Sequence, residues 1–326
     1  MSRVWKTQVI ALTLALTLVL MGTHIIIKFT KFTVATELPS SCTRNKMMSQ
    51  LKVIQPGSLV ERTENVNCIQ ARLSGMKFPI CIYPAATDIY ISRVLLNGNY
   101  FDGYAVSRFL LALKRDRRLQ FVDIGANIGV YSLPAARVTQ VLAVEPNWRS
   151  MARLARAVHF GSVNSNITLV QNAVSNVCTK YNVGVDSTNQ GHAFLMPVNA
   201  TRCITTLAGN PCNVLSQTTT VLLNDLLPLM RSTAALLKVD VEGHEINVFT
   251  ESSAGQFFDQ VDVHLVYMEW AFCKKQSPPI VQRLLNFFYS RNYTVCDLLN
   301  YTLRQHYRDW PENVIFKKLT YTNDYF

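Results

Sequence analysis

The chain has 326 residues, of which 49% are hydrophobic and 16% are charged, and its net charge is +11. This composition excludes a disordered chain, and the length fits one large domain or two small ones. The positive charge favours contact with anionic surfaces. The one dense basic run is residues 114–118, so nucleic-acid binding is not predicted.

An uncharged apolar run, Val9–Ile27, follows the first residues of the chain. As a helix it would be roughly 28 Å long, close to the hydrocarbon thickness of a bilayer. No small-residue cleavage site follows, so we interpret the run as an uncleaved signal anchor rather than a cleaved signal peptide. This interpretation predicts a short cytosolic tail at 1–8, a membrane helix at 9–27 and a stem at 28–50.

N-glycosylation sequons lie beyond this run. They begin at Asn166, Asn199, Asn292 and Asn300. The eight cysteines also suit an oxidising compartment. Cys68–Cys81 and Cys203–Cys212 are short-range candidate disulfides, and buried free thiols are the alternative. These signals predict a single-pass type II membrane protein of the endoplasmic reticulum or Golgi, with the bulk of the chain in the lumen.

The elements beyond the stem fall into two parts. Residues 51–119 are predicted to be an N-terminal extension packed on the core, with a helix at Tyr104–Leu113. From residue 120, apolar runs alternate with helical patterns, which is typical of βαβ units. Strands are predicted at 120–124, 140–146, 167–174, 235–243 and 263–270, and helices at 129–137 and 150–160. Residues 120–326 should therefore form one α/β domain with a mostly parallel sheet.

Two further features of that domain are predicted. Residues 175–232 are rich in Asn, Thr and Gly, and we expect short strands or loops there, over the ligand edge of the sheet. The segments YTVCDLL and NVIFKK near the end are predicted to form a closing antiparallel pair.

Ligands of open α/β sheets bind beyond the carboxyl ends of the strands, which draws attention to FVDIGANIGVYS at 121–132. This turn lacks both the G-x-G-x-x-G spacing of a dinucleotide site and the lysine of a phosphate loop. Gly125 and Gly129, on either side of Asn127, allow the backbone to approach a ligand closely. Asp123 precedes the turn, and an anion there suits a cationic ligand such as S-adenosylmethionine.

Later strand ends add to this prediction. Glu145 ends the second strand, where its carboxylate can accept both hydroxyls of a ribose. Asn172 follows the third strand and is a predicted neighbour of an adenine ring. With Asp123 and the glycine turn, these residues form the predicted cofactor-binding set. The alternative is a Rossmann-like core with ordinary acids at its strand ends.

The spaced segments FVDIGANIGVYSLPAA, VLAVEPN, NAVSN, NQGH, LNDLLP and LLKVDVEGHE closely resemble the FkbM-type methyltransferases. The similarity covers the chain from about Cys81 onward. It implies a class I methyltransferase fold, Rossmann-like and α/β, with a seven-stranded, mostly parallel sheet and helices on both faces. It also implies S-adenosylmethionine as cofactor and O-methyl transfer as the reaction. The apolar run near the N-terminus resembles that of secretory-pathway animal members of the family.

The acceptor-side chemistry is predicted to lie in KVDVEGHE, where Asp240, Glu242 and His244 are the candidate catalytic residues. The fourth strand ends beside the first, so its end should face the transferred methyl group. His244 has the ordinary pKa of a general base, and Asp240 is the other candidate. Glu269 ends the fifth strand at the same edge, and His192 is a candidate for the acceptor side. Asp240, Glu242 and Glu269 could instead hold a divalent cation, although the preferred prediction has no metal.

The acceptor is predicted to be a glycan or another molecule that bears a hydroxyl. Two rival functions stay open. A Golgi-type glycosyltransferase would share the anchor, the stem and the sequons, and its D-x-D metal motif is weakly mimicked by Asp240-Val241-Glu242. A catalytically silent lumenal binding protein is the other rival. The glycine turn, which a nucleotide-sugar site does not need, favours the methyltransferase.

Overall fold

A computed structural model describes residues 51–59, 66–200 and 211–322. The predicted tail, anchor and stem lie outside these residues. Among the helices that are described, none is long and apolar enough to cross a membrane.

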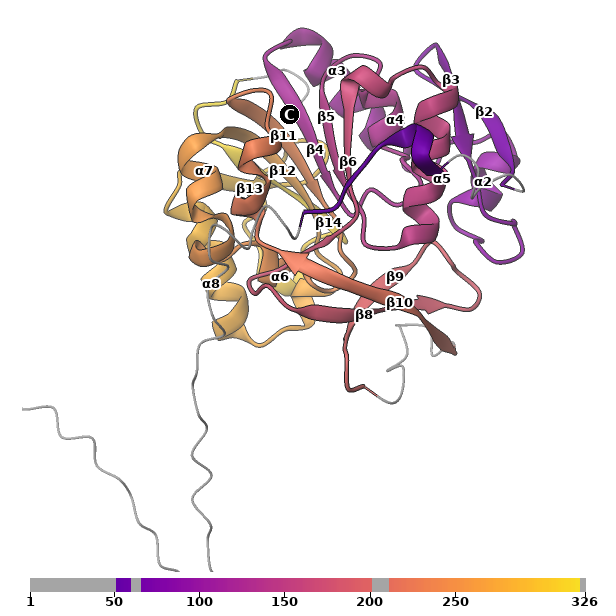
Figure 1. Ribbon diagram of the computed structural model, residues 1–326. Helices are drawn as coiled ribbons and strands as arrows, with labels where there is room; N and C mark the ends of the chain where they lie inside the picture. Colours follow the sequence, from indigo (N-terminus) through magenta and orange to yellow (C-terminus); the bar gives the residue numbers. More distant parts are fainter. Residues whose placement is uncertain (1–50, 60–65, 201–210, 323–326) are drawn as a thin grey trace, which may run out of the picture. The chain divides into compact units, whose positions relative to one another are not determined.

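An eight-stranded sheet forms the centre of the fold (Figure 1). Its strand order is β1-β6-β5-β4-β11-β12-β14-β13. These strands are β1 (Val53–Ile54), β6 (Ile167–Val170), β5 (Val141–Val144), β4 (Leu119–Ile124), β11 (Ala234–Val239), β12 (Asp262–Glu269), β14 (Asn313–Lys318) and β13 (Tyr293–Cys296). The five strands from β6 to β12 run parallel, and β14 is antiparallel to both of its neighbours. The predicted mostly parallel sheet and its closing antiparallel pair are confirmed.

The sheet has one strand more than the seven predicted. β1 comes from the N-terminal extension and pairs antiparallel with β6 at the edge of the sheet, through Val53 opposite Val170 and Ile54 opposite Leu169. The other strands follow the order β6-β5-β4-β11-β12-β14-β13. This is the seven-stranded arrangement that the resemblance implies, extended by a short edge strand.

Helices cover both faces of the sheet because side chains alternate along its strands. On β4, Phe121 packs into a cluster with α3 and α5, whereas Val122 packs into a second cluster with α7 and α8. The helices are α2 (Ser92–Leu96), α3 (Gly103–Arg115), α4 (Ser132–Ala135), α5 (Trp148–Phe160), α6 (Glu245–Val248), α7 (Gln256–Gln260) and α8 (Pro278–Tyr289). The predicted helix at 129–137 is thus a short helix set between turns.

The predicted third strand, 167–174, is split between two sheets. β6 ends at Val170, and β7 (Ala173–Val174) begins a four-stranded sheet of order β7-β10-β8-β9. Its other strands are β8 (Lys180–Asp186), β9 (Ala193–Pro197) and β10 (Cys212–Val221). Figure 1 shows these strands gathered at one end of the main sheet, and β7 begins where β6 ends. β8, β9 and β10 therefore lie at the carboxyl edge, as predicted, whereas residues 230–232 have returned to the amino edge, where the amide of Arg231 donates to Gln120 Oε1 over 2.7 Å.

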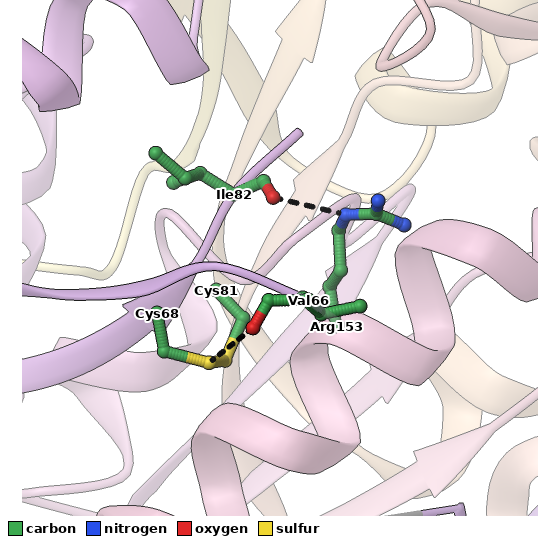
Figure 2. Close-up of a disulfide and its surroundings, with 5 residues drawn as sticks. All are labelled: Val66, Cys68, Cys81, Ile82 and Arg153. Carbon is green, nitrogen blue, oxygen red and sulfur yellow. Dashed lines mark hydrogen bonds between the residues drawn. A yellow bond between two sulfur atoms is a disulfide. The ribbon is translucent and has the colours of Figure 1, made fainter. Parts of the chain in front are cut away.

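A hairpin of β2 (Cys68–Leu73) and β3 (Met76–Cys81) is closed by the predicted disulfide between Cys68 and Cys81 (Figure 2). Arg153 of α5 donates from Nε to the carbonyl oxygen of Ile82 over 3.2 Å, and its guanidinium carbon lies 3.7 Å from the centroid of the Tyr83 ring. The hairpin is thereby fixed against α5.

Of the other described cysteines, two are disulfide-bonded and two are free. Cys178 and Cys212 are also disulfide-bonded. The predicted partner of Cys212 is Cys203, which lies outside the described residues. Cys273 and Cys296 are free and buried.

Candidate active site

A cavity of about 400 Å³ opens at the carboxyl ends of β4, β5, β11 and β12. Its volume falls in the range of small-molecule sites. Of the predicted site residues, six line this cavity. They are Gly125, Asn127, Glu145, Asn172, Asp240 and Glu242. His192 and Glu269 line it as well. Asp123, Gly129 and His244 do not.

The glycine turn is shaped by the neighbouring strand. Gly125 has a φ of +86°, and a Cβ atom there would lie 1.8 Å from the carbonyl oxygen of Asp240. Only glycine allows β4 and β11 to approach so closely just beyond their paired ends. Gly129, with a φ of +93°, packs instead against Leu154 and Leu133. One glycine therefore shapes the cavity, and the other shapes the packing of the turn on α5.

Glu145 is held by two backbone amides. Its Oε2 accepts a hydrogen bond from the amide of Asn127 and its Oε1 from the amide of Asn147, both over 2.8 Å. Each oxygen keeps a further lone pair, so the carboxylate can also accept two hydroxyls. Burial raises the pKa of Glu145 to about 7, and the two amides oppose that rise. This arrangement fits the ribose of an adenosine ligand.

Asp123 is fully buried and does not line the cavity. Ser132 Oγ donates to its Oδ2 over 2.6 Å, and Lys238 Nζ lies 3.5 Å from its Oδ1. Lys238 also donates to the carbonyl oxygen of Gly125 over 2.9 Å and lies 3.3 Å from Asp240 Oδ2. Burial lowers the pKa of Lys238, but Asp240 and Asp123 outweigh it and hold that pKa above its ordinary value. The expected direct contact between Asp123 and a cationic ligand is therefore replaced by an internal ion pair.

Lys238 was not among the predicted site residues. A lysine inside the apolar run LLKVDV was itself a signal, because a charge in a strand buried on both faces needs a partner. Lys238 finds two such partners, Asp123 on β4 and Asp240 after β11. It joins β4 to the turn after β11 and lines the cavity.

The turn after β11 places Glu242. Glu242 and Gly243 both have positive φ values, of 54° and 95°. The amides of Val241 and Gly243 donate to Glu245 Oε1, over 2.9 and 3.2 Å. Glu245 therefore stabilises the turn that carries Glu242, a role that was not predicted from the sequence. Burial raises its pKa to about 8.

His244 lies on the far side of this turn. Its Nε2 is 2.7 Å from Ser175 Oγ, and its ring packs edge-on against Tyr181. Burial lowers its pKa to about 4. These contacts belong to a structural histidine, and the structure does not bring His244 together with the other candidate catalytic residues. The positive φ at Glu242 and Gly243 turns the chain away before His244 is reached.

Asp240, Glu242 and Glu269 do come together, with carboxylate oxygens within 4.8 Å of one another. Burial, followed by Asp240 and Glu242, raises the pKa of Glu269 above its ordinary value. Asp240 pairs with Lys238, and Glu242 Oε2 lies 2.9 Å from His192 Nε2. Lys238 and His192 therefore each contact one of the three acids.

Asn172 binds backbone on both sides of the cavity wall. Its Oδ1 accepts from the amide of Lys52 over 2.8 Å, and its Nδ2 donates to the carbonyl oxygen of Thr219 over 3.0 Å. It lines the cavity, as do Ala173 and Val174.

The chain is similar to known proteins. The model of the methyltransferase FkbM domain matches residues 123–295. Methyltransferase FkbM from Methylobacillus flagellatus is 16% identical, with 66% of this chain and 47% of that chain covered and a TM-score of 0.41. An S-adenosylmethionine-dependent O-methyltransferase from Thermotoga maritima is 10% identical, with 78% and 79% covered and a TM-score of 0.34. No curated protein matches the chain significantly.

The fold and the site define an α/β protein of the class I methyltransferase type, with S-adenosylmethionine as its cofactor. The chain belongs to the family of the methyltransferase FkbM domain, whose model covers more than half of it. It spans about half the length of the Methylobacillus FkbM structure.

Proposed function

We propose that this protein is an S-adenosylmethionine-dependent O-methyltransferase. The main support is the position of Glu145. It lines the cavity, and its two oxygens accept hydrogen bonds from the backbone amides of Asn127, in the glycine turn, and Asn147. When bound, the cofactor supplies an electrophilic methyl group on a positively charged sulfonium. Glu145 would bind the ribose, Asn172 would lie near the adenine, and Gly125 leaves room for the cofactor beside Asp240.

The acceptor side of the cavity suits a hydroxyl. Asp240, Glu242, Glu269 and His192 all line the cavity and can form hydrogen bonds with an acceptor hydroxyl. These groups can orient an acceptor oxygen and exclude water from it. Such a polar surface supports a sugar hydroxyl as the nucleophile, and we propose a glycan as the acceptor.

We also propose that the protein is a type II membrane protein of the endoplasmic reticulum or Golgi, with this domain in the lumen. The apolar run Val9–Ile27 and the sequons support the proposal. The disulfide between Cys68 and Cys81 supports it too, since disulfides persist in oxidising compartments and are rare in the cytosol.

Calorimetry of the full-length protein with S-adenosylhomocysteine tests the cofactor assignment. Glu145→Ala leaves two ribose hydroxyls without an acceptor, so binding should weaken by about 1–3 kcal/mol. Glu145→Gln keeps one acceptor oxygen and should fall between parent and Glu145→Ala. Glu251→Ala, at an exposed glutamate outside the cavity, is the matched control.

A nucleotide sugar titrated in parallel separates the rival functions. Binding of the nucleotide sugar without binding of S-adenosylhomocysteine would replace the methyltransferase with the glycosyltransferase. Equal binding of S-adenosylhomocysteine by the parent and Glu145→Ala would remove Glu145 from the site. Cofactor binding with no methyl transfer to a secretory glycan would remove the glycan acceptor, and no transfer to any hydroxyl-bearing acceptor would favour the silent binding protein.

A further inference from the structure

His192 stands out among the groups that line the cavity. Its side chain is 15% exposed, and its Nε2 lies 2.9 Å from Glu242 Oε2. A carboxylate at Nε2 makes that nitrogen the N–H donor and leaves Nδ1 with its lone pair. Within the described part of the chain, Nδ1 has no hydrogen-bond partner and is not sealed from solvent. The ring therefore offers a basic nitrogen to a ligand in the cavity.

The loop that carries His192 is attached to the glycine turn. Asn127 Nδ2 donates to the carbonyl oxygen of Gly191 over 3.0 Å, and the amide of His192 donates to the carbonyl oxygen of Asn189 over 2.9 Å. A Cβ atom at Gly191 would come within 3.2 Å of Asn127 Nδ2, so the contact is close. His192 is thus held next to the turn that, in the proposed function, receives the cofactor.

Three other candidate bases are less suitable than His192. Burial and the neighbouring acids raise the pKa of Glu269, which favours its protonated form, and Asp240 is paired with Lys238. His244 is outside the cavity, and burial lowers its pKa to about 4. For His192, burial lowers the pKa, whereas Glu242, Asp186 and Asp240 raise it and prevail.

We propose that His192, oriented by Glu242, is the general base that accepts the proton of the acceptor hydroxyl. The inference rests on the proposed function and names a residue for it. The new bond joins the acceptor oxygen to the methyl carbon, and the electron pair of the broken carbon–sulfur bond stays on sulfur. The hydroxyl proton goes to His192 Nδ1, and Glu242 stabilises the resulting imidazolium through Nε2–H.

The first test compares turnover with cofactor affinity. His192→Gln keeps a donor toward Glu242 but has no basic nitrogen, so turnover should fall by about 10²–10⁴-fold. The assay follows labelled methyl groups from S-adenosylmethionine into oligosaccharides released from secretory glycoproteins. Affinity for S-adenosylhomocysteine should stay within about twofold of the parent, because the change removes a proton acceptor only. His159→Gln, at an exposed histidine of α5, is the control.

Glu242→Gln and the pH profile give the second readout. The kcat/KM of the parent should rise with pH as a histidine loses its proton. The kcat/KM of His192→Gln should not show this rise. Glu242→Gln should lower turnover with a smaller effect, since it weakens the orientation of the ring without removing the base. Turnover of His192→Gln within about threefold of the parent would overturn the proposal.

A third readout needs no acceptor. Nitrogen NMR of ¹⁵N-histidine-labelled protein identifies the tautomer of each ring, and the proposal requires His192 to carry its proton on Nε2. A proton on Nδ1 in the parent would overturn it even if no glycan is methylated. If the parent binds S-adenosylhomocysteine and shows the Nε2 tautomer but labels no glycan, the glycan acceptor fails and the base assignment stands.

Discussion

Glu245 is the residue whose burial has the clearest consequence for stability. Its side chain is 1% exposed, and its Oε1 accepts the amides that close the turn around Glu242. The folded pKa is about 8, above its ordinary value of 4.5, so between these values the folded state holds a proton that the unfolded chain has released. The contribution of Glu245 to the free energy of unfolding is therefore full below pH 4.5 and is lost as pH rises toward 8.

Glu245→Gln should remove this dependence, because glutamine keeps an acceptor oxygen and carries no proton equilibrium. The stability of the variant relative to the parent should rise steadily between pH 5 and pH 8. Denaturant unfolding at several pH values measures the difference. Glu251→Gln is the control, since Arg291 lowers the pKa of the exposed Glu251, which therefore stays charged between pH 5 and pH 8 in both states. A difference for Glu245→Gln that stays constant with pH would contradict the argument.

The two central strands, β4 and β11, are joined by the buried pair of Asp123 and Lys238. Lys238→Met would leave the Asp123 charge buried without its cation and should destabilise the fold by about 3–5 kcal/mol. Asp123→Asn combined with Lys238→Met should recover most of that loss, because no uncompensated charge remains. Denaturant unfolding compares these variants with Lys180→Met, at an exposed lysine on β8. A decrease of less than about 1 kcal/mol in the free energy of unfolding of Lys238→Met would contradict this prediction and would indicate that water reaches the pair.

The strands were predictable because buried parallel strands appear in the sequence as continuous apolar runs. β4, β5, β11 and β12 all carry such runs, and the acids at their ends mark the cavity edge. The break between β6 and β7 was not predictable. It depends on Asn172, whose partners at Lys52 and Thr219 are distant in the sequence.

The site was predictable to a similar degree. Strand ends placed Glu145, Asp240 and Glu242 at one edge, and the structure brings them into one cavity. The roles of Lys238 and His244 could be assigned only from the tertiary structure. The sequence does not show which residues these two side chains contact or whether they face the cavity.

At the scale of the whole molecule, the sequons differ in exposure. Asn199 and Asn292 are exposed, whereas Asn166 is half-buried and its Nδ2 donates to the carbonyl oxygen of Ala136 over 2.9 Å. A glycan attaches at this nitrogen, so Asn166 is sterically and chemically disfavoured. If the domain is lumenal, glycosidase treatment of protein from secretory cells should increase its gel mobility. Asn292→Gln should remove one glycan, and Asn166→Gln should remove none.

The glycosidase and protease experiments can also contradict the proposal that the domain lies in the lumen. A domain that shows no glycosidase shift and is cut by protease added to sealed microsomes lies in the cytosol. Loss of a glycan in Asn166→Gln alone would contradict the exposure argument while leaving the lumenal placement intact.

The strand order also sets when the site can exist during synthesis. β4 and β5 are neighbours in the chain, so the glycine turn and Glu145 can meet early. Asp240 and Glu242 join them only after β11 has been made, and β14, later in the chain than any other described strand, lies inside the sheet between β12 and β13. Contacts between such distant segments form slowly. A nascent chain that stops before β14 leaves β12 with an open edge and β13 with no partner in the sheet, so the ribosome must deliver nearly the whole domain before the sheet can close.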